Sequence, residues 1–197
     1  MNDPEFTVLS RSAYVGVGTK VWHFSQIGDQ AKIGKNCIIG SFVYVDRNVV
    51  IGNNCKIQNK ALIYDPAVIH DGVFIGPGAI LTNDKNPRAV STSGEIINTG
   101  EWNKVGVEVF EGASIGAGAI CVAPIKIGKW AVVGAGSVVI KDVKNYSLVV
   151  GNPARHVAWV GPSGVKLRKL SDILFECPKT LIKFEEIDSE LHEIIQQ

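Results

Sequence analysis

Aliphatic side chains recur at every sixth position along most of the chain. The first run is Val15, Val21, Ile27, Ile33, Ile39, Val45, Ile51, Ile57, Ile63, Ile69, Ile75 and Leu81, and the second is Val109, Ile115, Cys121, Ile127, Val133 and Val139. A small or β-branched residue stands four positions after most of them, and glycine often follows the aliphatic residue directly. Because a helix has about 3.6 residues per turn, a six-residue period favours short strands joined at corners.

Three such strands are predicted to close one triangular coil. In this all-β parallel helix the aliphatic residue points into a prism, the small residue packs near a corner, and glycine permits the turn. No coil buries enough surface alone, so neighbouring coils must hydrogen-bond to each other. A β-sandwich is the alternative, but its strands recur at irregular intervals of about 8 to 12 residues. The period does not determine the hand, and the usual crossover rule favours a right-handed one.

The repeat is interrupted between Leu81 and Val109 by a polar stretch. A long loop held at both ends by rigid structure is typical of a binding loop. We therefore predict a β-helix domain at residues 1–160, with a loop inserted at residues 82–108 that projects from one corner.

The six-residue pattern fades after Val143, and residues 161–197 are predicted to form a cap over the open end of the prism. Within the cap, Leu170–Phe184 predicts two short strands. Asp188 and Ser189 are residues that commonly begin helices, so Asp188–Gln197 predicts one short helix.

Composition narrows the function classes. The chain has 197 residues, 46% hydrophobic and 20% charged, with a formal net charge of +1. That balance excludes a disordered tail and gives no electrostatic reason to expect nucleic acid. No apolar run is long enough to span a membrane, and Met1–Thr7 lacks the layout of a signal peptide. Cys37, Cys55 and Cys121 are predicted to be core residues, and the four cysteines, which form no C-x-x-C pair, are expected to be reduced thiols in a cytoplasmic protein.

The six-residue pattern resembles the hexapeptide-repeat acyltransferases, whose prism winds left-handed. The resemblance implies a left-handed parallel β-helix that assembles as a homotrimer, with active sites between subunits and acetyl-CoA as co-substrate. No metal, nucleic acid or membrane is expected as a partner.

Longer motifs narrow the resemblance across residues 8–160. They are Val21-Trp-His-Phe24, Lys56-Ile-Gln-Asn59, Thr82-Asn-Asp84, Asn86-Pro-Arg88, Gly112-Ala-Ser-Ile-Gly-Ala117, Val132-Val-Gly-Ala-Gly-Ser-Val-Val139, Lys141-Asp-Val143 and Val149-Val-Gly-Asn-Pro-Ala-Arg155. Together they resemble N-acetyltransferases acting on 3-amino-3-deoxy sugars carried by UDP or dTDP, enzymes that supply precursors of surface polysaccharides such as O-antigen or S-layer glycan. The chain departs from that family at Lys60, where a second asparagine is usual.

The absence of histidine from the loop also indicates which kind of group accepts the acyl chain. Members of this fold that acylate hydroxyl groups typically carry a histidine base in or beside the projecting loop, and no histidine occurs between Thr82 and Glu108. A sugar amine titrates near an α-amino group, at about 7.7–8.0, so part of it is already a neutral nucleophile at pH 7. The sequence therefore favours an amine acceptor. Another amine or a hydroxyl acceptor, and a non-catalytic scaffold, remain as alternatives.

The resemblance assigns Asn83 as the catalytic residue, whose side-chain oxygen orients the reacting amine. The alternative is that Asn83 caps backbone groups where the loop begins. The expected substrate contacts are Gln58, Asn59, Tyr64, Asp65, Asp84 and Arg88. Arg88 suits a pyrophosphate, since its fork matches phosphate oxygens, or is a surface charge. Gln58 and Asn59 otherwise cap stacked corners, and Asp65 is otherwise a solvated carboxylate.

Acetyl-CoA is expected to lie in a groove between two prisms. The residues expected to contact its amide chain and phosphates are Ser114, Gly116, Ala117, Gly134, Ala135, Lys141, Asn152, Pro153 and Arg155. A zinc-dependent carbonic anhydrase of this fold is rejected, because His23, His70, His156 and His192 show none of the close spacing that its zinc site requires. His23 is either a nucleotide contact or a structural histidine.

Overall fold

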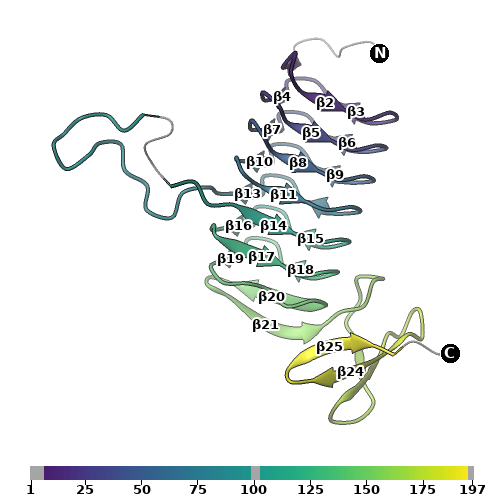
Figure 1. Cartoon of the computed structure of the whole chain (residues 1–197). Helices are drawn as coiled ribbons and strands as arrows, with labels where there is room; N and C mark the ends of the chain where they lie inside the picture. The colour runs from purple at the N-terminus through teal and green to yellow at the C-terminus, as the bar shows by residue number, and fades with distance from the viewer. Residues whose placement is uncertain (1–6, 99–102, 195–197) are drawn as a thin grey trace.

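The computed structural model describes residues 7–98 and 103–194, and the chain folds as a left-handed parallel β-helix followed by a small antiparallel sheet (Figure 1). Every strand in the coils pairs in parallel with the strand one coil away, as Ile39 does with Ile57. The predicted fold class is confirmed. The predicted domain boundary at residue 160 and residues 1–6 of that domain fall outside what the structure tests.

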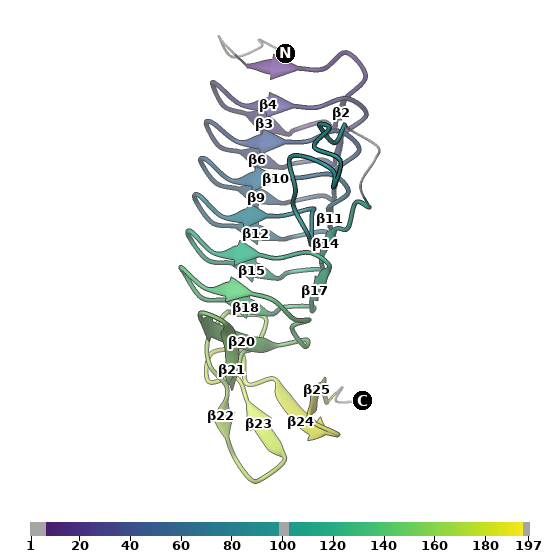
Figure 2. The same ribbon diagram turned by 90° about the vertical axis from the view of Figure 1, so that its left-hand side faces the viewer.

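Three sheets form the faces of the prism (Figure 2). Sheet A contains β1 (Val8–Leu9), β4 (Gln26–Ile27), β7 (Tyr44–Val45), β10 (Leu62–Ile63), β13 (Ile80–Leu81), β16 (Ile120–Cys121) and β19 (Val138–Val139). Sheet B contains β2 (Tyr14–Val15), β5 (Lys32–Ile33), β8 (Val50–Ile51), β11 (Val68–Ile69), β14 (Val107–Val109) and β17 (Ile125–Ile127). Sheet C contains β3 (Lys20–Val21), β6 (Ile38–Ile39), β9 (Lys56–Ile57), β12 (Phe74–Ile75), β15 (Ser114–Ile115), β18 (Val132–Val133), β20 (Ser147–Gly151) and β21 (Ala154–Trp159).

The chain turns three corners in each coil. The A–B corner joins sheet A to sheet B, as at residues 46–49; the B–C corner joins sheet B to sheet C, as at residues 52–55; and the C–A corner joins sheet C to the next strand of sheet A, as at residues 58–61. The projecting loop replaces one A–B corner, between β13 and β14, and extends far from the prism (Figure 1). A bridge between Val90 and Ile96 folds part of this loop back on itself.

The aliphatic residue of each repeat fills the prism, as predicted. Ile33, Ile57 and Ile63 are fully buried, and the small residues at the corners, including Cys37 and Cys55, are buried with them. Cys121 is also a core residue, and all four cysteines are free and buried.

The glycine after the aliphatic residue has a different role from the one predicted. A Cβ on Gly76 would lie 2.6 Å from the backbone nitrogen of Ala117 in the next coil, so this position requires glycine because the coils approach closely. The left-handed turn belongs to the corner residue two positions later, such as Gly78 with a φ of 67°.

The C-terminal cap differs from the prediction at its end. β22 (Arg168–Lys169), β23 (Leu174–Glu176), β24 (Lys183–Ile187) and β25 (Glu190–Glu193) form one antiparallel sheet. The short helix predicted from Asp188 is wrong over the described residues, and its last three residues lie outside them. Asp188 and Ser189 both have positive φ, at 50° and 60°, and form the two-residue turn that joins β24 to β25. Such turns need left-handed residues, so the polar pair serves a hairpin instead of a helix cap.

A second core holds the cap to the last coil. It contains Tyr146, Trp159, Cys177, Phe184 and Leu191. The described residues form no helix, and so none that is long and apolar enough to cross a membrane.

Adjacent isoleucines in β6 test this description of the core. Ile39 is fully buried, whereas Ile38 points outward and is 37% exposed. We expect Ile39→Ala to lower the free energy of unfolding by about 2–5 kcal/mol, because it leaves a cavity between coils. Ile38→Ala is the matched control and should cost about 1 kcal/mol or less. Urea denaturation of both variants provides the measurement, and equal losses would contradict the assigned inward register.

Candidate functional site

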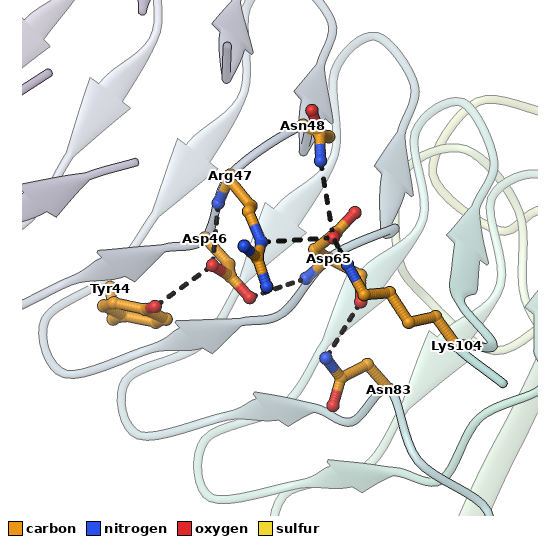
Figure 3. A network of polar contacts seen from close by, with 7 residues as sticks. All are labelled: Tyr44, Asp46, Arg47, Asn48, Asp65, Asn83 and Lys104. Atoms are coloured by element: carbon orange, nitrogen blue, oxygen red, sulfur yellow. Dashed lines mark hydrogen bonds and ion pairs between the residues drawn. The ribbon is translucent and has the colours of Figure 1, made fainter. Parts of the chain in front are cut away.

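Polar side chains from three successive coils meet at the A–B corner (Figure 3). Asp46, Arg47 and Asn48 come from one corner, Asp65 from the next, and Asn83 from the point where the projecting loop begins. Lys104 joins them from the far end of that loop. The stacking of coils therefore brings together residues that lie 17 to 39 positions apart in the chain.

Asp65 is the centre of this cluster. It is only 3% exposed, and its Oδ2 lies 2.6 Å from Lys104 Nζ and 3.7 Å from Arg47 Nε. Asn48 Nδ2 donates to the same oxygen at 3.4 Å. A buried carboxylate needs such partners, because burial removes its hydration. The alternative prediction for Asp65, a solvated carboxylate, is wrong, because the corner and Lys104 at the end of the loop bury this side chain.

Asp46 extends the cluster toward sheet A. Its Oδ2 accepts the backbone N–H of Asp65 at 3.2 Å, and its Oδ1 accepts the hydroxyl of Tyr44 at 3.1 Å. Burial, and then the neighbouring Asp46 charge, raise the pKa of Tyr44 above its ordinary value. The Tyr44 hydroxyl is therefore a neutral donor at pH 7. The ring of Tyr64 lies 5.5 Å from that of Tyr44.

Asn83 is held from two sides. Its Nδ2 donates to the backbone oxygen of Asp65 at 2.9 Å, and its own backbone oxygen accepts the N–H of Val105 at 3.1 Å. The side-chain oxygen points away from Asp65 (Figure 3). The first of these bonds is the backbone capping predicted as the alternative role of Asn83, and Asp84 adds a local cap, since its Oδ1 accepts the N–H of Asn86 at 2.8 Å. Asn83 thus presents an oriented acceptor beside the base of the loop.

The other predicted substrate contacts are not gathered at this cluster. Arg88 lies exposed on the projecting loop, where its guanidinium donates to the oxygen of Pro87 at 2.8 Å. Gln58 and Asn59 lie at the C–A corner, on the other edge of sheet A. Asn59 Oδ1 accepts the N–H of Ser41 at 3.0 Å, so this side chain does cap a stacked corner.

Four of the nine residues predicted to bind acetyl-CoA also line the C–A corner. Gly116 and Ala117 form one turn of it, and Gly134 and Ala135 form the next. The turn at Asn152 and Pro153, between β20 and β21, lies beside them, since the N–H of Gly151 donates to Ser137 Oγ at 3.1 Å. Ser114 lies half-buried on the outer face of sheet C.

Lys141 and Arg155 are brought together at the end of the prism. Both line a cavity of about 520 Å³ between the last coil and the C-terminal sheet, and Lys144 adds a third cation. His156 also lines this cavity, and its Nδ1 lies 2.6 Å from Ser147 Oγ. Burial lowers the pKa of His156, so the lysines and the arginine carry the positive charge there at pH 7.

The remaining histidines show no shared site. His70 Nε2 lies 3.0 Å from Glu108 Oε1, and its ring stacks on Phe110. His192 is exposed in β25. Across residues 7–98 and 103–194, no group of three or more His, Cys, Asp and Glu side chains is arranged to hold a metal ion.

Sequence reasoning missed the side chains that surround Asp65. Arg47 and Asn48 belong to no motif, and Lys104 lies 39 positions from its partner. The available signal was the 18-residue coil, because it places residue 47 beside residue 65. No such signal existed for Lys104, because the inserted loop interrupts the 18-residue spacing between stacked positions.

Family models match both runs of the repeat. The bacterial transferase hexapeptide (six repeats) matches residues 12–47 and 48–83, and the hexapeptide repeat of succinyl-transferase matches residues 105–141. The chain belongs to the hexapeptide-repeat transferases. Its fold is similar to that of LpxA, a UDP-N-acetylglucosamine acyltransferase from Bacteroides fragilis, with a TM-score of 0.62 at 17% identity over 78% of this chain and 58% of that one.

Two curated relatives show the range of acceptors in this family. The dTDP-3-amino-3,6-dideoxy-alpha-D-galactopyranose 3-N-acetyltransferase of Aneurinibacillus thermoaerophilus is 50% identical over 60 residues, which are 30% of this chain and 31% of the relative. A serine acetyltransferase of Haemophilus influenzae is 35% identical over 85 residues, 43% of this chain and 31% of the relative. The matched region spans less than a third of each of these relatives.

The Asp65–Lys104 pair is predicted to close the base of the loop. Lys104→Met leaves the buried carboxylate with a weaker partner, so the N–H of Val105 should exchange with solvent about 10-fold faster or more. Hydrogen exchange of that amide provides the measurement.

Lys126→Met is the matched control. Its Nζ lies 3.7 Å from Glu108 Oε2 in a pair whose lysine is mostly exposed, so little change is expected there. Unchanged protection of Val105 in Lys104→Met would show that the loop is held by other contacts.

Proposed function

We propose that the protein transfers the acetyl group of acetyl-CoA to the 3-amino group of a 3-amino-3-deoxy sugar linked to UDP or dTDP. The observation that carries this proposal is the oriented amide of Asn83 at the base of the loop, which offers an acceptor oxygen and no basic group. The name of the Aneurinibacillus relative supports the acceptor class. We infer a role in supplying surface polysaccharide precursors in the cytoplasm.

The chemistry fits an acceptor that needs no strong base. The neutral amine attacks the thioester carbonyl, its N–H held by Asn83 Oδ1. The tetrahedral oxyanion then collapses, the C–S bond breaks, and the nitrogen gives its second proton to the departing CoA thiolate or to water. The products are the amide and free CoA. Asp65 acts by fixing the positions of Asn83 and Lys104. The predicted direct contact between Asp65 and the substrate stays a prediction.

Two corners must come together for this reaction. The Asn83 cluster lies at the A–B corner, whereas the glycine turns predicted to face acetyl-CoA lie at the C–A corner, on the other edge of sheet A. The outer face of sheet A is apolar from Tyr44 onward, with Leu62, Ile80, Ile120 and Val138 following in successive coils. Such a row suits burial against another protein surface. We propose that a homotrimer covers it and joins the A–B corner of one subunit to the C–A corner of its neighbour.

The cavity at the end of the prism supports acetyl-CoA as donor. Lys141, Lys144 and Arg155 suit the phosphates of CoA. Gly116 and Gly134 are explained by the next coil, since a Cβ on Gly116 would lie 2.4 Å from the backbone nitrogen of Ala135, so the support for acetyl-CoA comes from the cations of the cavity.

Thiol release from acetyl-CoA tests the reaction. The purified protein should release thiol with a UDP- or dTDP-linked 3-amino sugar, and Asn83→Ala should lower kcat/KM about 10-fold or more, since an oriented hydrogen bond to the amine is lost. Asn98→Ala, an exposed asparagine on the same loop, is the matched control and should keep full activity. Equal rates in both variants would remove Asn83 from the mechanism, and release with L-serine instead would identify a hydroxyl acceptor.

The pH profile separates an amine from a base-assisted hydroxyl. With no histidine acting as base, kcat/KM should rise with pH through the ionisation of the substrate amine, at about 7.7–8.0, and then stay level. The rise should persist in His156→Gln. A profile governed by a group that titrates near pH 6.5, and abolished by replacement of one histidine, would contradict the mechanism.

A further inference from the structure

The left-handed residues of the C–A corner form one column along the prism. Each has a φ between 60° and 68°, and from the N-terminal end they are Phe24, Phe42, Lys60, Gly78, Gly118 and Gly136. Their backbones are in line, because the N–H of Phe42 donates to His23, that of Lys60 to Ser41, and that of Gly78 to Asn59, each one coil earlier. The column therefore runs from two aromatic rings through one cation to bare glycine.

A phenylalanine is an unexpected residue in this conformation. Left-handed φ crowds the Cβ, so asparagine and glycine usually occupy such turns. The B–C corner follows this rule at Gly18, Asn36, Asn54, Gly72 and Gly112. An aromatic residue at such a position needs a compensating interaction.

The same chain shows what that compensation is. At the B–C corner, Trp130 and Tyr146 also have positive φ. Tyr146 is 7% exposed in the second core, and the partly buried Trp130 packs against that core. At the C–A corner, Phe24 and Phe42 remain 47% and 52% exposed. Their rings stack on each other at 4.9 Å with an interplanar angle of 14°, and the exposed Trp22 lies two residues from Phe24.

We propose that Phe24 and Phe42 form a stacking platform for the base of the nucleotide sugar, and that Lys60 binds its diphosphate. This inference rests on the proposed function and identifies how that substrate is held. Aromatic rings stack on any nucleobase, whatever its hydrogen-bonding edge. An ammonium group one coil away supplies a point charge for phosphate.

The order of the column matches the order of groups in the substrate. Coils are about 4.8 Å apart, so Lys60 lies one step from Phe42, and Gly78 lies one step further. Gly78 precedes β13, which leads directly to Asn83. Base, diphosphate and amino sugar thus follow one another along the prism axis to the level of Asn83, about 10 Å from the platform. The Asn83 that meets the sugar is that of the neighbouring subunit in the proposed trimer, because each subunit's own Asn83 lies on the other edge of sheet A.

The surroundings favour a nucleotide over a second copy of the chain as the occupant. Lys60, Gln58 and Asn59 place a cation and amides directly beside the rings, and an Asn59 oxygen already fixes the turn at Ser41. A buried contact between subunits is usually depleted of charge at its centre.

Calorimetric titration of the full chain with uridine, UDP and dTDP, in the absence of acetyl-CoA, tests the platform. We expect the double variant Phe24→Asn/Phe42→Asn to bind all three ligands about 5- to 150-fold more weakly, the range for a stacked base. Asparagine is the residue that the chain itself uses at Asn36 and Asn54, so the denaturation midpoint should not fall. Lys60→Asn should weaken UDP about 10-fold and leave uridine unchanged. Tyr14→Ala, an exposed aromatic residue on sheet B, is the matched control.

Each outcome separates this proposal from the proposed function. UDP binding that is equally tight in the double variant overturns the platform and leaves acetyl transfer untouched. Thiol release with an amine, together with no affinity for any nucleoside diphosphate, also overturns the platform but keeps the reaction class. A change in oligomeric state in the double variant, measured by sedimentation, would show that the rings are a subunit contact and would overturn the proposal. Loss of nucleotide affinity with an unchanged assembly supports it.

Discussion

The hydrogen-bonded register between coils is the constraint on which the other features depend. Within each run of the repeat a strand pairs with the residues 18 positions away, so the corners lie directly over one another. Close approach of the coils explains why glycine follows the aliphatic residue, and it also explains why the Asp46 side chain reaches the backbone N–H of Asp65. A column of equivalent corner positions becomes a surface whose chemistry can change from one end of the prism to the other. The side chains that we propose to bind substrate therefore lie along such columns of corner positions as well as at the base of the loop.

The loop lengthens one coil so that Val68 pairs with Glu108, and the structure shows how this insertion is held at its base. Asn83 at its start and Lys104 at its end both contact Asp65, one with the backbone oxygen and one with the carboxylate. A buried carboxylate whose Oδ2 contacts Lys104, Arg47 and Asn48 stabilises one arrangement of these partners, because any other leaves a charge unpaired. Residues 84–98 then extend from the prism while Asn83 keeps a defined orientation.

The repeat was predictable from the sequence because a six-residue period records burial directly, and Ile33, Ile57 and Ile63 fill the prism as expected. Two features were not accessible in that way. The contact between Lys104 and Asp65 spans a loop that does not follow the six-residue repeat, so no regular spacing predicted it. The turn at Asp188 and Ser189 has the composition of a helix cap, and only the pairing of Phe184 with Glu193 decides between cap and hairpin. Both features depend on which residues pair with each other, and the preferences of single residues do not reveal such pairing.

The left-handed corner positions add information that neither the period nor the motifs carry. Gly, Asn and Gln satisfy such a turn at little cost, so their presence says only that the chain turns. A large ring there must be stabilised by something that packs on it, and at Tyr146 that partner is the C-terminal sheet. Tyr146 and Phe42 share the same left-handed φ, but Tyr146 is buried in the second core whereas Phe42, stacked on Phe24, stays 52% exposed. A half-exposed ring held in a strained conformation, beside a cation and above a row of glycines, has the properties of a surface kept for a ligand.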